Sequence, residues 1–282
     1  MPGTIAKNRI NVPGDGLTLA ADAYGDPAAP PVCFFHGGGQ SRRSWTGSAR
    51  RVAQAGYYGI TFDLRGHGES GWAPDGDYLL EAYGRDVEAV LQALGRPAAL
   101  VGASRGGQAA LVGGSRHPDL VRLIMLADVA PHIHDTGVNE IRAFFKASEV
   151  GFTSLEQAAA ALNQHLGQPL LPDVSGLAKA MREQGGRLFW HWDPRTAEPQ
   201  FLHPPSEGEA LVAAARRVTT PVVLVRAELS EIVSKESVQR FKDLTPQLEV
   251  ETAAAVGHMF TGDRNDSFAE RLLQHLARHM PL

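Results

Sequence analysis

The chain has 282 residues, of which 43% are hydrophobic and 21% are charged, close to the average of globular proteins. This length allows one large α/β unit with an insertion or two small domains, and the composition excludes a disordered, collagen-like or coiled-coil protein. The formal net charge of -4 lacks the basic excess that binding to nucleic acid requires. We therefore expect no nucleic-acid partner.

Cysteine content and apolar runs indicate the cellular setting. The single cysteine, Cys33, cannot close a disulfide within the chain, and Met1–Asn8 lacks the apolar run of a secretory signal peptide. The longest apolar runs, such as Ala98–Val101 and Leu123–Ala127, are far shorter than the ~20 residues that span a bilayer. We expect a cytoplasmic protein without a membrane partner.

In chain order, the first predicted element is an antiparallel edge ribbon, since the alternating stretches Ile10–Val12 and Leu17–Tyr24 flank a Pro-Gly-Asp-Gly turn signal. Buried strands are predicted at the short apolar runs Val32–Phe35, Gly59–Phe62, Ala98–Val101, Leu123–Leu126 and Val222–Val225. Segments with helical periodicity lie between most of them, at Ser44–Ala55, Leu79–Leu94 and Gly107–His117. This alternation predicts an α/β fold, with a parallel sheet covered by helices on both faces.

The interval between Leu126 and Val222 is far longer than the other crossovers need, which indicates an insertion. It contains predicted helices at Ile141–Ser148, Leu155–Leu166 and Val174–Gln184, followed by the polar, proline-bearing stretch Arg187–Pro205. We assign residues 132–214 to a helical cap, and residues 1–131 and 215–282 to the core. A last strand at Leu248–Thr252 and a helix from Ser267 onward end the core.

A candidate nucleophile lies between a predicted strand and a predicted helix. Gly102-Ala103-Ser104-Arg105-Gly106 has the G-x-S-x-G spacing, in which the two glycines leave room for a sharp turn that exposes the serine hydroxyl. A serine hydroxyl is a poor nucleophile at neutral pH and needs a histidine base and a carboxylate. His258 follows the last strand, at the same sheet edge as Ser104, and is our candidate base. For His36, His67, His132, His134 and His191 we expect structural roles as turn or cap residues.

Together these motifs resemble the α/β-hydrolase superfamily over nearly all of the chain. The resemblance rests on His36-Gly37-Gly38-Gly39, on Asp63 to Ser70 (DLRGHGES), on Gly102 to Gly106 and on Gly257-His258. It implies a mostly parallel eight-stranded sheet with a cap inserted after the sixth strand. It also implies that Asp63 to Ser70 is a structural turn.

The triad acid has two candidates. The superfamily usually places this acid after the seventh strand in a G-x-x-D pattern, but this chain has Ala227 and Ser230 at those positions, with Glu231 one residue later. Asp128, which ends the sixth strand, resembles the acid of the esterases and haloalkane dehalogenases that carry it there. We favour Asp128 and keep Glu231 as the alternative.

The glycine loop Gly37–Gly39 can supply an oxyanion hole, since a tight loop without side chains exposes backbone N–H groups. The family pattern implies the amide of Gly38 as one donor and that of Arg105 as the other. The side chain of Arg105 either joins a salt bridge, the more common arrangement, or points into the pocket to attract an acidic substrate.

No sequence pattern predicts a cofactor or a metal. The chain lacks a P-loop, a G-x-G-x-x-G after a strand, a Cys/His metal pattern and the spacing of a calcium loop; Asp263-Arg264-Asn265-Asp266 reads as helix capping.

We therefore expect a serine hydrolase that cleaves a carboxylic ester, lactone or related acyl bond of a small molecule. The aromatic side chains of Trp190, Trp192 and Phe144 are candidate substrate contacts in the cap. The alternatives are a cofactor-free triad enzyme of another type (C–C hydrolase, perhydrolase or dioxygenase) and a non-catalytic ligand-binding module. The sequence leaves open whether the chain forms a homodimer.

Overall fold

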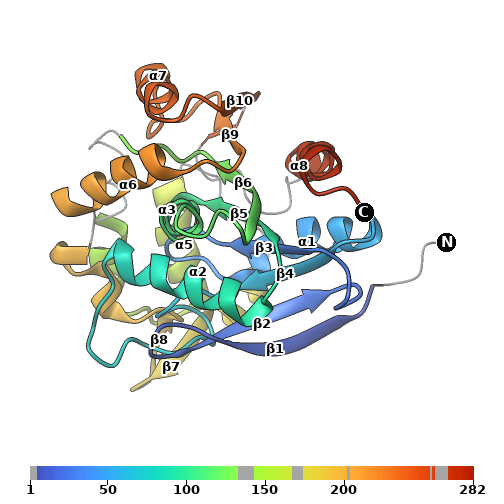
Figure 1. The fold of residues 1–282 in the computed structure, drawn as a ribbon. Coiled ribbons are helices and arrows are strands. Elements are labelled where there is room, and N and C mark those ends of the chain that lie inside the picture. Colours follow the sequence, from blue (N-terminus) through green and yellow to red (C-terminus); the bar gives the residue numbers. More distant parts are fainter. Residues whose placement is uncertain (1–4, 133–142, 167–173, 202–203, 255, 258–265) are drawn as a thin grey trace.

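The computed structural model describes residues 5–132, 143–166, 174–201, 204–254, 256–257 and 266–282 (Figure 1). Its centre is an eight-stranded sheet in the order β1-β2-β4-β3-β5-β6-β9-β10. The strands are β1 (Lys7–Pro13), β2 (Thr18–Tyr24), β3 (Pro31–Phe35), β4 (Tyr58–Phe62), β5 (Ala98–Ala103), β6 (Val121–Ala127), β9 (Val222–Ala227) and β10 (Leu248–Ala253). The β1–β2 and β2–β4 pairs are antiparallel, and all others are parallel. The predicted edge ribbon and the mostly parallel sheet are confirmed.

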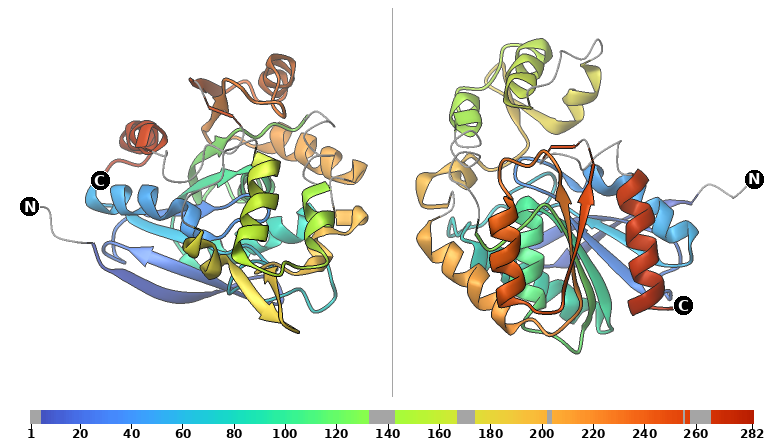
Figure 2. Two further views of the ribbon diagram at one scale, coloured as in Figure 1. Left: turned by 180° about the vertical axis from the view of Figure 1, so that it is seen from behind. Right: turned by 90° about the horizontal axis from the view of Figure 1, so that it is seen from above.

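Helices cover both faces of this sheet (Figure 2). The core helices are α1 (Thr46–Gln54), α2 (Leu80–Leu94), α3 (Ser104–Gly114), α6 (Pro205–Arg217), α7 (Lys235–Leu244) and α8 (Asp266–His279), and a short 3₁₀ helix, η1 (Arg42–Trp45), precedes α1. Apolar side chains of α2, α3, α6 and α7 pack on one face of the sheet, and those of α1 and α8 pack on the other. The inner parallel strands β3, β4, β5, β6 and β9 are buried on both sides, which explains their continuous apolar runs.

The insertion between β6 and β9 lies beyond the carboxyl ends of the parallel strands (Figure 2). It contains a helical segment at 143–148, α5 (Leu155–Leu166), the 3₁₀ helices η2 (Ser175–Ala180), η3 (Pro194–Ala197) and η4 (Pro199–Phe201), and the strands β7 (Met181–Gln184) and β8 (Arg187–Trp190). The helix α6 spans the expected boundary at residue 214. Its Leu211, Ala214 and Ala215 belong to the larger core cluster.

The prediction of one helix over Val174–Gln184 is confirmed only for its first half: Ser175–Ala180 forms the 3₁₀ helix η2, whereas Met181–Gln184 forms a strand of a β-hairpin. Met181 pairs with Trp190 and Gln184 pairs with Arg187 around Gly185-Gly186, whose φ angles are +58° and +72°. Two consecutive residues with positive φ form the tight turn that suits a two-residue hairpin. This local turn, together with the burial of Trp190, overrides the apolar periodicity that favoured a helix.

Within the described residues, no helix is both long and apolar enough to span a membrane.

Candidate active site

The candidate nucleophile Ser104 lies at a strained turn between β5 and α3. Its φ angle is +45°, in the left-handed region that residues with side chains rarely adopt, at a cost of about 1–3 kcal/mol. A Cβ on Gly102 would lie 2.5 Å from the Cα of Gly107, and one on Gly106 would lie 2.4 Å from the carbonyl oxygen of Phe35. The two glycines of the motif therefore let the turn pack against backbone, and the serine remains partly exposed.

The glycine loop after β3 lies directly against this serine. A Cβ built on Gly37 would be 3.4 Å from the Cβ of Ser104. The amides of Gly37 and Gly39 already donate hydrogen bonds, to Gln40 Oε1 (2.9 Å) and His67 Nε2 (3.1 Å). The described residues offer no acceptor to the amide of Gly38, which is exposed. The loop thus brings an available N–H group to the neighbourhood of the nucleophile.

Gln40 is a contributor that the sequence analysis did not single out. Its backbone N–H donates to the carbonyl oxygen of Gly37 (3.2 Å), while its side-chain oxygen accepts from the Gly37 amide. These two bonds close the glycine loop on itself. A polar residue directly after a glycine run is the only sequence signal for this role.

The side chain of Arg105 points away from the site and into the core, where it makes the expected salt bridge. Its Nη1 lies 2.8 Å from Oε2 of Glu207 on α6, and its Nη2 donates to the carbonyl oxygen of Phe201 (2.9 Å). The guanidinium also lies over the ring of Tyr83, at 5.6 Å from the centroid. The backbone N–H of Arg105 lies in the first turn of α3, where it has no intrahelical acceptor.

Asp128 follows β6 just as Ser104 follows β5. The two preceding residues, Ala127 and Ala103, are paired in register on these neighbouring strands, so both side chains leave the same sheet edge. Asp128 is buried and has a φ of +54°. Its Oδ1 accepts a hydrogen bond from the amide of Ala227 (3.0 Å), and its Oδ2 accepts one from Ser230 Oγ (2.5 Å). The carboxylate is therefore fixed in direction at the edge that carries the nucleophile.

The alternative acid, Glu231, is exposed to solvent. Its neighbour Ser230 occupies the position where the family pattern has an acid, and this serine binds Asp128. The amides of Ile232 (3.2 Å) and Val233 (2.9 Å) donate to Ser230 Oγ, which leaves its proton for the carboxylate of Asp128. Ser230 is thus a second contributor that the sequence analysis noticed only as a departure from the pattern.

The candidate base, His258, lies outside the described residues, as do His134 and the loop to Asn265. The chain leading toward it is described as far as Gly257. The amide of Leu229 donates to the carbonyl oxygen of Val256 (3.0 Å), and the amide of Glu228 donates to that of Ala253 (2.9 Å). These bonds hold the start of the His258 segment beside the loop that carries Ser230.

Three other histidines have structural roles, as expected. His36 Nε2 accepts from the amide of Leu64 (3.0 Å), His67 Nε2 from that of Gly39 (3.1 Å), and His191 Nδ1 from that of Gly68 (3.0 Å). Burial lowers the pKa of His36 and of His67 to about 3, and it lowers the pKa of His191 as well. The rings of His36 and His67 join the glycine loop to the turn at Asp63 to Ser70, and that of His191 joins the cap to the same turn.

The carboxylate of Asp63 is part of the same structural turn. Its Oδ1 accepts from the backbone amide of Arg42 (2.7 Å), and its Oδ2 accepts from the amide of Glu69 (2.9 Å) and from the guanidinium of Arg42. The side chain of Asp63 is therefore engaged in holding the turn.

This arrangement predicts a pH dependence of stability. The unfolded chain protonates His36 and His67 near pH ~6.5, whereas the folded chain does so only near pH 3. Between these values the unfolded state binds more protons, so the free energy of unfolding falls as the pH falls, by up to about 1.4 kcal/mol per pH unit for each histidine. Urea unfolding of His67→Gln should show a slope from about pH 6 to about pH 5 that is shallower than that of wild type by this amount. Equal slopes would contradict a neutral, buried His67.

The cap brings an aromatic cluster onto the glycine loop. The Cζ3 atom of Trp192 and the Cζ atom of Phe145 lie 3.4 Å and 3.6 Å from where a Gly39 Cβ would be. Trp192 and Trp190 are buried, with rings stacked at a centroid distance of 5.4 Å, and Trp190 Nε1 donates to Ser148 Oγ (3.1 Å). Trp192 thus contacts the loop, while Trp190 lies deeper in the cap.

The third candidate substrate contact, Phe144, is half-buried and packs on the edge of this cluster. Its ring lies 6.0 Å from that of Trp190 and 6.1 Å from that of Trp192. A cavity of about 20 Å³, large enough for one water molecule, lies between the cluster and Arg182. Apart from this cavity, the aromatic rings of the cluster pack against one another inside the cap.

A mostly parallel eight-stranded sheet with a serine at a strained strand-to-helix turn defines the class of α/β hydrolases. The sequence matches the family described as alpha/beta hydrolase fold over residues 30–264. The chain belongs to this family.

Among curated relatives, the chain is 27% identical over 274 residues to an sn-1-specific diacylglycerol lipase, ABHD11, of Mus musculus, covering 90% of this chain and 83% of that protein. It is also 27% identical over 235 residues to 2-(acetamidomethylene)succinate hydrolase of Mesorhizobium japonicum, covering 82% of each. A crystal structure of E-2-(acetamidomethylene)succinate hydrolase superimposes with a TM-score of 0.81 at 24% identity, over 99% of this chain and 100% of that one. These relatives are hydrolases, and the structural likeness shows the fold.

Proposed function

We propose that the protein is a serine hydrolase that cleaves a carboxylic ester, lactone or related acyl bond of a small molecule through an acyl-enzyme. One observation carries this proposal: Ser104 is held at a φ of +45° with the glycine loop packed against it. A residue with a side chain keeps such a backbone conformation only where the surrounding structure enforces it, and such strain clusters at functional sites. The hydrolase and lipase relatives support the same class.

In the proposed reaction the Oγ of Ser104 attacks the carbonyl carbon while His258 takes the hydroxyl proton. The carbonyl oxygen becomes negative and accepts hydrogen bonds from the amides of Gly38 and Arg105. The tetrahedral intermediate then expels the alcohol, which receives the proton from His258. Water, deprotonated by the same imidazole, attacks the carbonyl carbon of the acyl-enzyme. The bond to Ser104 Oγ then breaks, the acid leaves, and His258 returns the proton to Oγ, which restores Ser104.

Asp128 is proposed to orient His258 and to stabilise the imidazolium. Its hydrogen bonds to Ala227 and Ser230 fix the carboxylate, and a carboxylate with about four lone-pair sites can still accept an imidazole N–H. Ser230 is then a positioning residue, which acts on the imidazole only through Asp128.

The cap is proposed to select the substrate by apolar contact. The guanidinium of Arg105 is engaged with Glu207 and is therefore not available to attract an acidic substrate. The aromatic rings of Trp192 and Phe144 favour an apolar or aromatic acyl or alcohol group.

Labelling with a fluorophosphonate tests the proposed nucleophile. An exposed hydroxyl beside a base and an oxyanion hole should attack the phosphorus atom, so we expect a single adduct on the wild-type protein by intact-mass measurement. Ser104→Ala should give no adduct and no ester hydrolysis, whereas Ser206→Ala, which changes an exposed serine on α6, should label like wild type.

Failure of the wild-type protein to react, under conditions in which a known serine hydrolase reacts, would contradict the proposal. Turnover that survives in Ser104→Ala would instead favour cofactor-free proton-abstraction chemistry by His258.

A further inference from the structure

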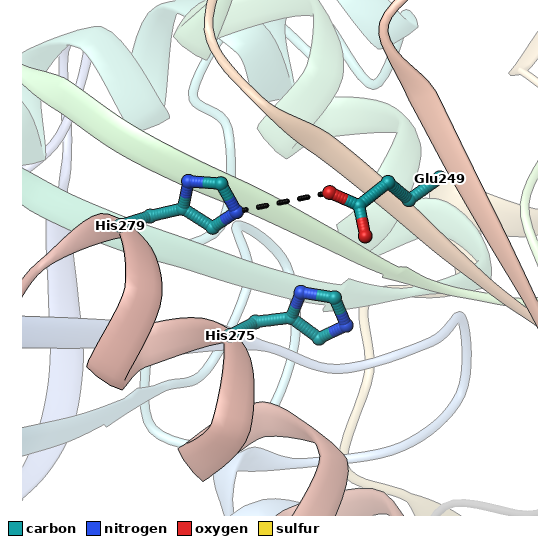
Figure 3. A group of neighbouring side chains, drawn as sticks. All are labelled: Glu249, His275 and His279. Carbon is teal, nitrogen blue, oxygen red and sulfur yellow. Dashed lines mark ion pairs between the residues drawn. The ribbon is translucent and has the colours of Figure 1, made fainter.

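Three side chains of the types that bind metals lie together near the amino end of the strand β10, whereas Ser104 follows the carboxyl end of β5. Glu249 is at the amino end of β10, and His275 and His279 are on α8, which packs beside it (Figure 3). One ligand atom from each of the three side chains lies within 4.8 Å of the others. Ser104 follows the carboxyl end of β5, which runs in the same direction as β10 within the sheet, so the two sites are separate.

Helix geometry places the two histidines together. Residues four apart lie on the same face of an α-helix, and the two imidazole rings are stacked within 5° of parallel at a centroid distance of 6.2 Å. The side chain of His275 is 4% exposed and that of His279 is 17% exposed, whereas that of Glu249 is 43% exposed. The site therefore has two largely buried nitrogen ligands and one carboxylate that can move.

Two ring nitrogens in this group lack the partners that buried polar atoms ordinarily have. Nδ1 of His275 and Nε2 of His279 are both buried, and the described residues give neither a hydrogen-bond partner. His279 Nε2 lies 3.9 Å from Oε1 of Glu249, too far for a hydrogen bond, and Figure 3 shows the ring directed at that carboxylate. Buried groups without partners are rare enough to need an explanation, and a bound ion is one of the recognised ones.

The other nitrogen of His275 is held by a carboxylate. Its Nε2 lies 2.7 Å from Oε1 of Glu251, and Glu251 also pairs with Arg271. When Nε2–H donates to this carboxylate, Nδ1 carries the lone pair and is ready to bind a cation. Metal-binding histidines commonly have such a carboxylate partner, which orients the ring and raises its basicity.

The donor set fits a borderline transition metal. Two imidazole nitrogens and a carboxylate oxygen are ligands that Zn²⁺ prefers, with bonds of about 2.0–2.2 Å that place tetrahedral ligand atoms about 3.4 Å apart. The present separations of up to 4.8 Å would close through small rotations of the Glu249 side chain and of the two imidazole rings. Nη1 of Arg278 lies 2.9 and 3.1 Å from the two Glu249 oxygens. The ion pair between Arg278 and Glu249 is exposed and therefore weak. The Glu249 carboxylate has enough lone pairs to bind both Arg278 and a metal ion.

We propose that Glu249, His275 and His279 bind a divalent transition-metal ion such as Zn²⁺, which ties the carboxyl-terminal helix α8 to the edge strand β10. Water completes the coordination. The sequence analysis expected no metal site, because the carboxylate comes from a different element than the H-x-x-x-H pair and only the fold brings them together. An ion that binds the folded chain in this way stabilises it against unfolding by mass action.

Titration of the full-length, metal-stripped protein with ZnCl₂ tests this site. We expect wild type to bind one equivalent saturably and to unfold at a higher temperature with Zn²⁺ present. His279→Gln and Glu249→Gln should each weaken binding on the order of 10-fold or more and remove the shift. Both residues are more exposed than His275, so these variants should fold. The matched control is His117→Gln, since His117 also pairs with a carboxylate, Glu88, at 3.1 Å, and it should behave like wild type.

Two outcomes would overturn the proposal: no saturable Zn²⁺ binding by wild type, or Zn²⁺ binding that is equally tight in both cluster variants. The second outcome would place the ion elsewhere, for example on an imidazole near Ser104. Zn²⁺ affinity and unfolding temperature are measured without substrate. The test of the metal site therefore gives the same answer whether or not the protein hydrolyses esters.

Discussion

Replacing Asp128 by asparagine should lower kcat for ester hydrolysis by about 10⁴-fold and leave the fold intact. The asparagine keeps an oxygen that can accept from the amide of Ala227, so the strand end stays in place. It loses the negative charge that stabilises the imidazolium and the acceptor that selects the productive tautomer of His258. Steady-state kinetics on one ester, with thermal unfolding of the same preparation, separate the catalytic loss from a loss of structure.

The matched control for this experiment is Glu231→Gln, which removes the alternative acid. Glu231 is exposed and Ser230, its neighbour, already binds Asp128, so this variant should retain nearly full activity. A collapse of kcat in Glu231→Gln with little change in Asp128→Asn would show that the glutamate orients the imidazole.

The second large effect concerns the buried ion pair behind the nucleophile. Glu207→Gln should lower the free energy of unfolding by about 3–5 kcal/mol, because it leaves the charge of Arg105 buried without its partner. The side chains of Arg105 and Glu207 are only 10% and 3% exposed, so water cannot replace the lost carboxylate. Urea unfolding at neutral pH measures the change directly.

Two further variants make this result specific. Glu209→Gln changes an exposed glutamate on the same helix and should cost little. The double variant Arg105→Met with Glu207→Leu removes both charges and should recover most of the lost stability, since apolar replacements of similar volume often match a buried pair. A loss below about 1 kcal/mol in Glu207→Gln would contradict a buried, coupled pair.

The ion pair between Arg105 and Glu207 also positions the backbone next to Ser104. Arg105 directly follows Ser104, and its guanidinium fastens the start of α3 to α6, while Oε1 of Glu207 accepts from the amide of Leu80 at the start of α2 (3.0 Å). One carboxylate therefore links the helices α2, α3 and α6 next to the turn that carries Ser104. We expect Glu207→Gln to lower kcat as well, through displacement of the Arg105 amide.

Much of the fold could be predicted from sequence because its signals are local. The turn Pro13-Gly14-Asp15-Gly16, the apolar runs of β3 to β6 and β9, and the alternating pattern of β10 each specify an element through a few adjacent residues. The G-x-S-x-G spacing is equally local, since it follows from the close backbone contacts of Gly102 and Gly106. The strand β7 differs from the predicted helix over Val174–Gln184 because the apolar spacing there also fits a helix, and only the Gly185-Gly186 turn and the burial of Trp190 favour a strand.

The relations between distant residues were decided by the tertiary structure. Sequence alone determined that Ser104 directly follows one strand, that Asp128 directly follows another and that Ser230 stands where the family pattern has an acid. It could not determine that the Ser230 hydroxyl binds Asp128, that Arg105 pairs with Glu207, or that Glu249 meets His275 and His279. Backbone sterics and hydrophobic periodicity act over a few residues and can be read along the chain. A hydrogen bond or an ion pair forms only where strand order, register and helix packing bring two side chains within about 3 Å of each other.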